Sequence, residues 1–393
     1  MSEDKDISKY IADYKFDEAL KLIETGEKIP KDVNTYSLQA FFDYIVKGKR
    51  FDIVNLLIDR KEILTDVYEY DTFNKSFLET LIKWLPIDED ALNEFEKLIG
   101  RFENINDEVA GYTLLSYAIN EKVKPAIVQS LINAGCDAGF KNTAEDNLVA
   151  QTVRINMMPK DDQLAYIDIL LKAGVDPSDI NVEKKNALHL VAEGHKKDLV
   201  KPLLDAGARP NEQDWHGQTV YYHAVAFKGG DDSIYNQLAE VEAPDFTLLD
   251  NSRETLLSVY LRSMQGSDRE NILLEKMIDD GADLLQSGEH YGKQKSGWDW
   301  IVEKPLNTLQ MALSKTGYNV NEQDNDGNTL LHKICRIDCN YSQETAKELY
   351  KKVKLLLENG ADASITNNKD ETAVMLASTD NLKGKIVELL LKK

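Results

Sequence analysis

The chain has 393 residues, 42% of them hydrophobic and 29% charged, a composition typical of proteins that fold in water and not of disordered ones. Its net charge of −21 repels phosphate backbones, which argues against a primary role in nucleic-acid binding, and it suits either solubility alone or a basic protein partner. The sequence has no secretory leader, no apolar run of about eighteen residues and only three cysteines, so we expect a cytoplasmic protein without a membrane segment or a disulfide framework.

The first hundred residues contain three amphipathic segments, at 16–26, 51–58 and 94–100. Each has apolar residues at helical spacing and ends near Gly26, Arg60 or Gly100. The ends are about 34 and 40 residues apart, close to the period of helical repeat proteins. The spacing predicts that residues 1–106 are divergent helical repeats at the N-terminal end of a longer array.

Two short phrases alternate from residue 107 to the C-terminus. The first is an apolar helical run that ends in glycine and a small residue, with its glycines at 135, 174, 207, 281, 317 and 360. The second, of the type Gly-x-Thr-Leu-Leu, begins near 111, 186, 217, 254, 327 and 371. This internal periodicity predicts a repeat architecture in which each repeat packs on its neighbours.

These phrases resemble the ankyrin-repeat family, which has a period of about 33 residues and a T-P-L-H-x-A signature. The clearest copy spans 186–211, and no copy has the family's proline after the threonine. The resemblance is strong over 107–393 and rests on pattern alone over 1–106. It implies an all-α solenoid of about eleven helix-turn-helix repeats with protruding finger loops. Second helices should end near 26, 60, 100, 135, 174, 207, 241, 281, 317, 360 and 393.

Several stretches depart from the regular period. Pro202 falls inside a second helix, so we expect a kink or a late helix start there. Residues 286–295 lengthen one interval and predict an enlarged finger loop, whereas 154–163 and 337–342 predict insertions between paired helices. Neutral drift in tolerant loops is the alternative explanation for these insertions.

Patterns typical of enzymes are missing from the sequence, including phosphate-binding loops, zinc-protease motifs and serine-hydrolase elbows. His332, Cys335 and Cys339 have a spacing that would place them on one helical face. The resemblance implies instead that His332 and His189 are structural, because both occupy the family's signature histidine position. We therefore expect no cofactor and no metal. Trp298 and Trp300 stand two residues apart at a helix start, so we expect at most one to face the core.

The resemblance also implies that a partner is recognised through finger loops and the concave face of the first helices. Trp215 and His216 occupy a finger tip, and tryptophan is enriched at binding hot spots; the alternative is that Trp215 packs on the neighbouring finger. The positions of this sequence that match the expected surface are Tyr112, Trp215, His216, Gln218, Phe227, Glu254, Arg262, His290, Tyr291, Asn325, Asp326 and Arg336.

These observations predict a non-enzymatic protein-binding scaffold, monomeric in isolation, that recognises a folded basic protein. Its most specific form would be an inhibitor or immunity protein. One alternative is an enzyme whose active site lies in residues 1–106, a segment that has neither histidine nor cysteine. Another is a structural spacer between partners. A single co-purifying protein would favour the scaffold, and activity in a substrate screen would favour the enzyme.

Overall fold

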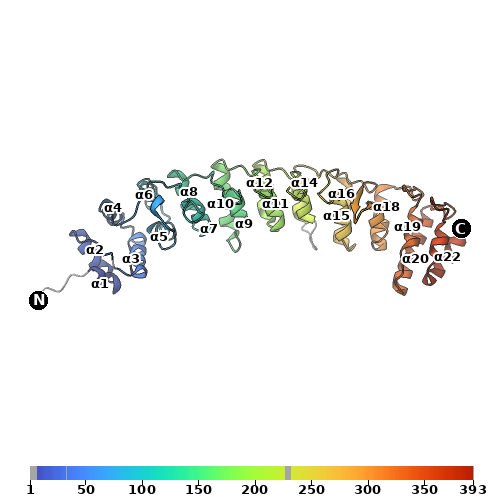
Figure 1. The fold of residues 1–393 in the computed structure, drawn as a ribbon, viewed down its shortest axis with the longest axis horizontal. Coiled ribbons are helices and arrows are strands. Elements are labelled where there is room, and N and C mark those ends of the chain that lie inside the picture. The colour runs from blue at the N-terminus through green and yellow to red at the C-terminus, as the bar shows by residue number, and fades with distance from the viewer. Residues whose placement is uncertain (1–6, 32, 226–231, 393) are drawn as a thin grey trace. The chain divides into compact units, whose positions relative to one another are not determined.

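The structure is a computed structural model that describes residues 7–31, 33–225 and 232–392. These ranges contain 22 α-helices, which follow one another along the chain as eleven pairs (Figure 1). None of the helices in the described ranges is long and apolar enough to cross a membrane. The all-α architecture of paired helices expected from the sequence is confirmed.

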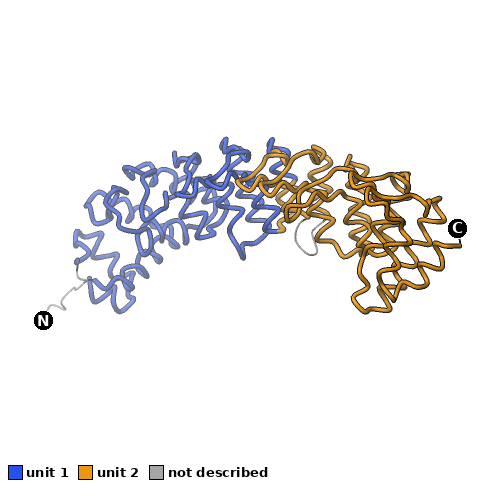
Figure 2. The backbone as a smooth tube through the Cα atoms, turned by 45° about the vertical axis from the view of Figure 1, so that its right-hand side comes forward, with its two compact units in different colours: residues 1–194, 201–208 blue, residues 195–200, 209–393 orange. Residues whose placement is uncertain are grey.

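The chain forms two compact units (Figure 2). Unit 1 comprises residues 1–194 and 201–208, and unit 2 comprises residues 195–200 and 209–393. The helical pairs of the first hundred residues all belong to unit 1, together with the first repeats of the clearer array.

Unit 1 is a stack of helical pairs. First helices pack on the first helices of the next repeat, as α9 does on α11, and second helices pack on second helices, as α8 does on α10. The elements are α1 (Ile7–Ala12), α2 (Phe16–Glu24), α3 (Thr35–Lys47), α4 (Phe51–Asp59), the 3₁₀ turn η1 (Val67–Glu69), α5 (Phe77–Trp84), α6 (Glu89–Ile99), α7 (Leu114–Asn120), α8 (Pro125–Asn133), α9 (Leu148–Arg154), α10 (Lys160–Lys172), α11 (Ala187–Glu193) and most of α12 (Val200–Asp205).

Unit 2 repeats this arrangement, with α15 packed on α17 and α16 on α18. One finger of unit 2 contains two strands. The elements are η2 (Lys197–Leu199), α13 (Val220–Val225), α14 (Asp232–Ala239), α15 (Leu256–Ser263), α16 (Asp268–Asp279), β1 (Ser287–His290), β2 (Lys293–Ser296), α17 (Gly297–Ile301), α18 (Leu306–Thr316), α19 (Leu330–Arg336), α20 (Gln343–Glu358), α21 (Ala373–Ala377), η3 (Asn381–Lys383) and α22 (Gly384–Leu391).

Capping side chains and glycines set the ends of these short helices. The hydroxyl of Thr113 accepts a hydrogen bond from the Ser116 N–H at 3.3 Å, and that of Thr255 accepts one from the Ser258 N–H at 3.1 Å. Such bonds satisfy donors that the first turn of a helix leaves unpaired. After a second helix, Gly135 has φ +101°, a left-handed conformation that ends the helix and that other residues rarely adopt.

The helix ends agree closely with those expected from the sequence, since every second helix stops within two residues of its predicted position. Pro202 lies in the first turn of α12, which begins late, after η2. A missing N–H is tolerated in that turn, so the predicted late start is confirmed. The insertion predicted at 337–342 lies between α19 and α20. Of the insertion predicted at 154–163, residues 155–159 lie between α9 and α10, and residues 160–163 form the first turn of α10.

The enlarged finger at 286–295 is a β-hairpin. Its strands pair antiparallel, with Ser287 opposite Ser296 and His290 opposite Lys293. The hairpin also corrects an expectation about the tryptophans, because Trp298 and Trp300 are both buried. Trp298 stacks on Tyr318 at a ring distance of 4.4 Å, and Trp300 is covered by His290 and Lys295 of the hairpin.

Candidate functional site

The signature histidines close capping interactions. His332 Nδ1 accepts a hydrogen bond from the Thr329 N–H at 3.1 Å, and its Nε2 donates to the Glu371 carbonyl oxygen at 3.0 Å. Burial, together with the positive charge of Arg336, lowers the pKa of His332 below its usual value. His189 lies in a matching capping box on Asn186. Both nitrogens of His332 therefore have structural partners.

The three thiols are buried and free of disulfides. Burial raises the pKa of Cys335 to about 12 and that of Cys339 to about 11. Within the described ranges, no group of three His, Cys, Asp or Glu side chains is arranged to hold a metal ion.

Asp214 holds the frame of the finger that carries Trp215 and His216. Its Oδ1 accepts the N–H groups of His216 at 2.8 Å and Gln218 at 2.9 Å, and its Oδ2 lies 3.1 Å from His223 Nε2. Burial acts to raise the pKa of Asp214, but these N–H groups and His223 outweigh it and hold that pKa below its usual value. The turn is thus shaped by a buried carboxylate and not by the residues at its tip.

Within the part of the chain that the structure describes, Trp215 and His216 are anchored through their backbone. The carbonyl oxygen of Trp215 accepts Asn251 Nδ2 at 2.8 Å, and that of His216 accepts the Asn251 N–H at 2.9 Å. The Trp215 side chain remains 65% exposed. Gln218, which also belonged to the predicted surface, is half-buried at the root of the same finger.

A backbone hydrogen bond links the next finger to the hairpin, since the Glu289 N–H donates to the Arg253 carbonyl oxygen at 2.9 Å. Three fingers of unit 2 are therefore hydrogen-bonded in succession. We call them the finger row and define it as residues 213–218, 249–254 and 287–296. Tyr291, at the turn of the hairpin, is 94% exposed.

The hairpin brings three predicted site residues together. The buried carboxylate of Glu254 accepts Arg262 Nη2 at 3.0 Å and lies 3.1 Å from His290 Nδ1. The His290 ring also contacts Trp300, with ring centres 5.0 Å apart, and Tyr291 at 4.5 Å. Glu254 thus positions Arg262 and His290, while Arg262 and Tyr291 face solvent.

Asn325 and Asp326 lie at the exposed tip of another finger of unit 2. Their carbonyl oxygens both accept hydrogen bonds from Asn368, at 3.0 Å each. Arg336, at the end of α19, is exposed and donates to Asn328 Oδ1 at 3.0 Å. Phe227 lies outside the described residues.

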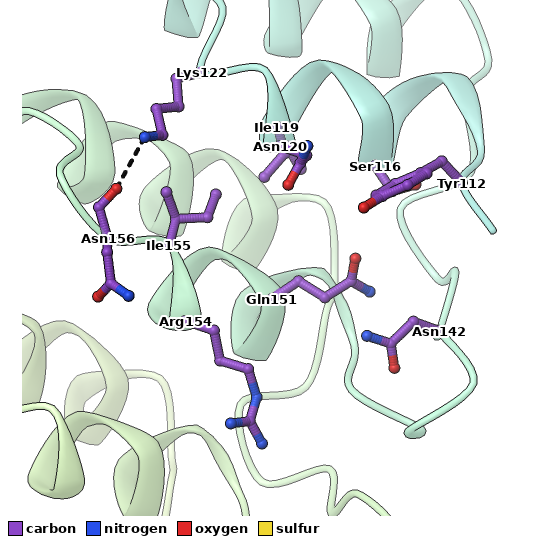
Figure 3. A pocket seen from close by; sticks show the side chains of 10 residues that line it. All are labelled: Tyr112, Ser116, Ile119, Asn120, Lys122, Asn142, Gln151, Arg154, Ile155 and Asn156. Carbon is purple, nitrogen blue, oxygen red and sulfur yellow. Dashed lines mark hydrogen bonds between the residues drawn. The ribbon is translucent and has the colours of Figure 1, made fainter. Parts of the chain in front are cut away.

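Tyr112 belongs to unit 1, where it lines a pocket of about 430 Å³ between α7 and α9 (Figure 3). These are the first helices of neighbouring repeats. Its ring is half-buried and lies edge-on to Tyr117, with centres 6.1 Å apart. The other lining residues are Ser116, Ile119, Asn120, Lys122, Asn142, Gln151, Arg154, Ile155 and Asn156.

The sequence interpretation missed a polar pair that recurs in both units. It joins the residue just before the N-cap of a first helix to a residue eight positions later, at the helix end. An eight-residue spacing of opposite charges about the cap is the signal that would have revealed most of these pairs. The pairs are Asp146–Arg154 at 2.8 Å, Lys185–Glu193 at 2.6 Å, Glu254–Arg262 at 3.0 Å, Lys295–Glu303 at 3.1 Å and the neutral-to-charged Asn328–Arg336 at 3.0 Å.

Comparison with known proteins identifies the repeat. The family profile described as ankyrin repeat matches residues 183–215. The B-cell lymphoma 3 protein homolog of Mus musculus is 27% identical over 232 residues, covering 55% of this chain and 46% of the mouse protein. The chain therefore spans less than half the length of that relative.

Solved structures with a similar chain path include the ankyrin repeat domain of Bcl-3, described as a unique member of the IkappaB protein family. It has 23% identity and a TM-score of 0.49, covering 63% of this chain and 99% of that one. A chain of the complex between the predatory endopeptidase Bd0816 of Bdellovibrio bacteriovorus and the immunity protein Bd3460 has 22% identity and a TM-score of 0.40. It covers 53% of this chain and 98% of that one.

Proposed function

The chain belongs to the ankyrin-repeat family, and from this premise we propose that it is a non-enzymatic scaffold that binds a folded protein through the finger row of unit 2. Ankyrin-repeat proteins act as protein-binding scaffolds. The partner of this chain, its basic character and the residues that contact it are parts of the proposal.

The observation that carries the proposal is the exposure of two large aromatic rings on hydrogen-bonded fingers. Trp215 is 65% exposed and Tyr291 is 94% exposed, although the hydrogen bonds that shape their fingers use other side chains and the backbone. Trp and Tyr are enriched at binding hot spots, and these two rings lie on fingers of one hydrogen-bonded row. Fingers held by mutual backbone bonds need little ordering on binding, which favours a folded partner.

The net charge of −21 supports a basic partner, because opposite charge speeds the encounter and selects against acidic competitors. A scaffold of this kind would act by covering its partner, as an inhibitor or immunity protein does. We place it in the cytoplasm as a monomer, where its three buried thiols would stay reduced.

The proposal is tested with two matched aromatic variants. The full chain captures its partner from the native lysate, and the identified partner is then purified and titrated. We expect Trp215→Ala to weaken binding by about 2 kcal/mol, or roughly thirtyfold in Kd, if the ring is a hot spot. The control is Tyr341→Ala, since Tyr341 is 100% exposed in the insertion between α19 and α20, outside the finger row.

The two variants give a clear decision. Full-strength binding by Trp215→Ala, or an equal loss of binding in the control Tyr341→Ala, would move the contact surface away from the finger row. An association rate that is the same at low salt and at about 0.5 M salt would mean that the acidic charge serves solubility and not partner choice.

A further inference from the structure

The pocket between α7 and α9 differs in charge from the chain as a whole. The chain is strongly acidic, yet none of the described residues that line this pocket is Asp or Glu. Two cations, Lys122 and Arg154, line it together with four side-chain amides and the hydroxyl of Tyr112. Its volume of about 430 Å³ is within the range of ligand sites.

The buried carboxylate of Asp146 orients the Arg154 side chain. Its Nε donates to Asp146 Oδ2 at 2.8 Å, and Asp146 also accepts Asn181 Nδ2 at 2.8 Å. Within the described residues, the two Nη groups of Arg154 make no hydrogen bond, and the side chain is 45% exposed. The guanidinium is therefore held in place through Nε while its outer donors stay available.

Lys122 stands on the opposite side of the pocket, directly after α7. Its Nζ donates to the Asn156 carbonyl oxygen at 2.9 Å (Figure 3). An ammonium group has three donors, so two remain for a ligand. Lys122 has φ +55°, a conformation that asparagine adopts more readily than most residues, and this allows a mild substitution.

The side-chain amide of Asn142 offers its Nδ2 group as a hydrogen-bond donor in the pocket. Its Oδ1 accepts the N–H groups of Ala144 at 2.9 Å and Asp146 at 3.0 Å, so the Nδ2 group is the end left for a ligand. Figure 3 places Asn142 and Gln151 on one side of the pocket, with Tyr112 close by. The pocket is therefore rich in hydrogen-bond donors, and its two cations against Asp146 leave a single excess positive charge.

We propose that this pocket binds carboxylate side chains on an acidic segment of a protein partner. Each carboxylate carries one negative charge and accepts several hydrogen bonds. Figure 3 draws Lys122 and Arg154 at separate edges of the pocket, so a different carboxylate of the segment would meet each cation. A phosphomonoester carries nearly two charges and is matched less well. The proposed protein-binding function supplies only the source of the carboxylates, which would be a local acidic segment on a partner that is basic overall. The pocket's preference for a carboxylate can be tested by itself.

The probe is a tri-glutamate peptide with blocked ends, titrated into the full chain by calorimetry at low salt. We expect a dissociation constant on the order of 1 mM, with Lys122→Asn weakening binding about fivefold or more and Tyr112→Phe about twofold. The matched control is Lys61→Asn, because Lys61 is an exposed lysine of unit 1 with φ +58° and does not line the pocket. Arg154 is left intact, since it also holds Asp146.

Several results would overturn the proposal. A tri-glutamine peptide that binds equally well would show that the pocket does not select charge, and an equal loss in Lys61→Asn would show diffuse attraction only. Tighter binding of inorganic phosphate, abolished by Lys122→Asn, would assign the pocket to phosphoryl groups instead. If the captured partner loses affinity with Trp215→Ala but the peptide is not bound, this inference fails and the proposed function stands. If the peptide binds but no partner is captured, this inference stands and the proposed function fails.

Discussion

The pair Asp146–Arg154 in unit 1 and the pair Glu254–Arg262 in unit 2 occupy the same place in their repeats but have different surroundings. In unit 1, Arg154 lines an open pocket. In unit 2, the hairpin places His290 on the Glu254 carboxylate and covers Trp300. The repeat framework thus places the same carboxylate–arginine pair in both units. The length of the neighbouring finger decides whether the groups around that pair are open to a ligand or packed together.

The largest expected loss of stability comes from a substitution that forces the β1–β2 hairpin away from α15. A Cβ atom on Gly288 would lie 3.0 Å from Ser258 Oγ and 3.3 Å from the Glu254 Cα. Gly288→Val should therefore overpack the contact with α15 and destabilise the chain by about 1–3 kcal/mol. Urea unfolding measures this, and exposure of Trp300 should shift its fluorescence to the red.

The control for that change is Gly292→Asn in the turn of the same hairpin. A Cβ there meets open space, and Asn tolerates φ +73° better than most residues. Equal destabilisation by both variants would mean that the close approach of Gly288 to α15 does not hold the hairpin in place.

Two arginine variants compare the stability that the Asp146–Arg154 pair contributes with that of the Glu254–Arg262 pair. Arg154→Met should destabilise the chain by about 1–2 kcal/mol, because Asp146 is buried and its remaining side-chain partner among the described residues is the neutral amide of Asn181. Arg262→Met should have a smaller effect, about 0.5–1 kcal/mol, since Glu254 retains His290. Denaturant unfolding of both variants gives the order, and the opposite order would show that His290 does not support Glu254.

Acid should weaken the cap of α19 in unit 2 through His332, whereas the cap of α9 in unit 1 is Asn147, which does not titrate. Because burial lowers the pKa of His332 in the folded chain, the unfolded chain binds more protons as the pH falls below about 6.5. This contribution to stability is complete above that pH and declines as pH falls toward the folded pKa, by at most about 1.4 kcal/mol per pH unit.

The measurement compares the free energy of unfolding at pH 7 and pH 5 in the parent and in His332→Gln. The variant should show the smaller loss between these two values. Identical losses would place the acid sensitivity at other groups.

The smallest expected effect concerns Trp215, in contrast with the covered Trp300. Trp215→Ala should change stability by no more than about 0.5 kcal/mol and the melting temperature by about 2 °C at most, because its finger is held by Asp214 and Asn251. A thermal melt beside the binding titration tests this. A much lower melting temperature with unchanged binding would make the ring a packing residue.

Much of the framework was predictable because it depends on local chemistry. A threonine such as Thr255 at a cap and a glycine such as Gly135 after a second helix act within a few residues, so their spacing predicted the helix ends. The pairing of Glu254 with His290 was not predictable, since 36 positions separate them and the contact depends on how the hairpin folds back. The burial of both Trp298 and Trp300 was missed for the same reason.

The sequence by itself therefore determined the all-α repeat architecture, the approximate length of each repeat and the places where loops are enlarged. These features follow from helical periodicity, caps and left-handed glycines, which act over one or two turns of chain. The tertiary structure alone decided which of the polar groups became available. Lys122 and Arg154 share a pocket, and His290 covers Glu254, only because stacked repeats bring together side chains that lie more than thirty positions apart in the chain.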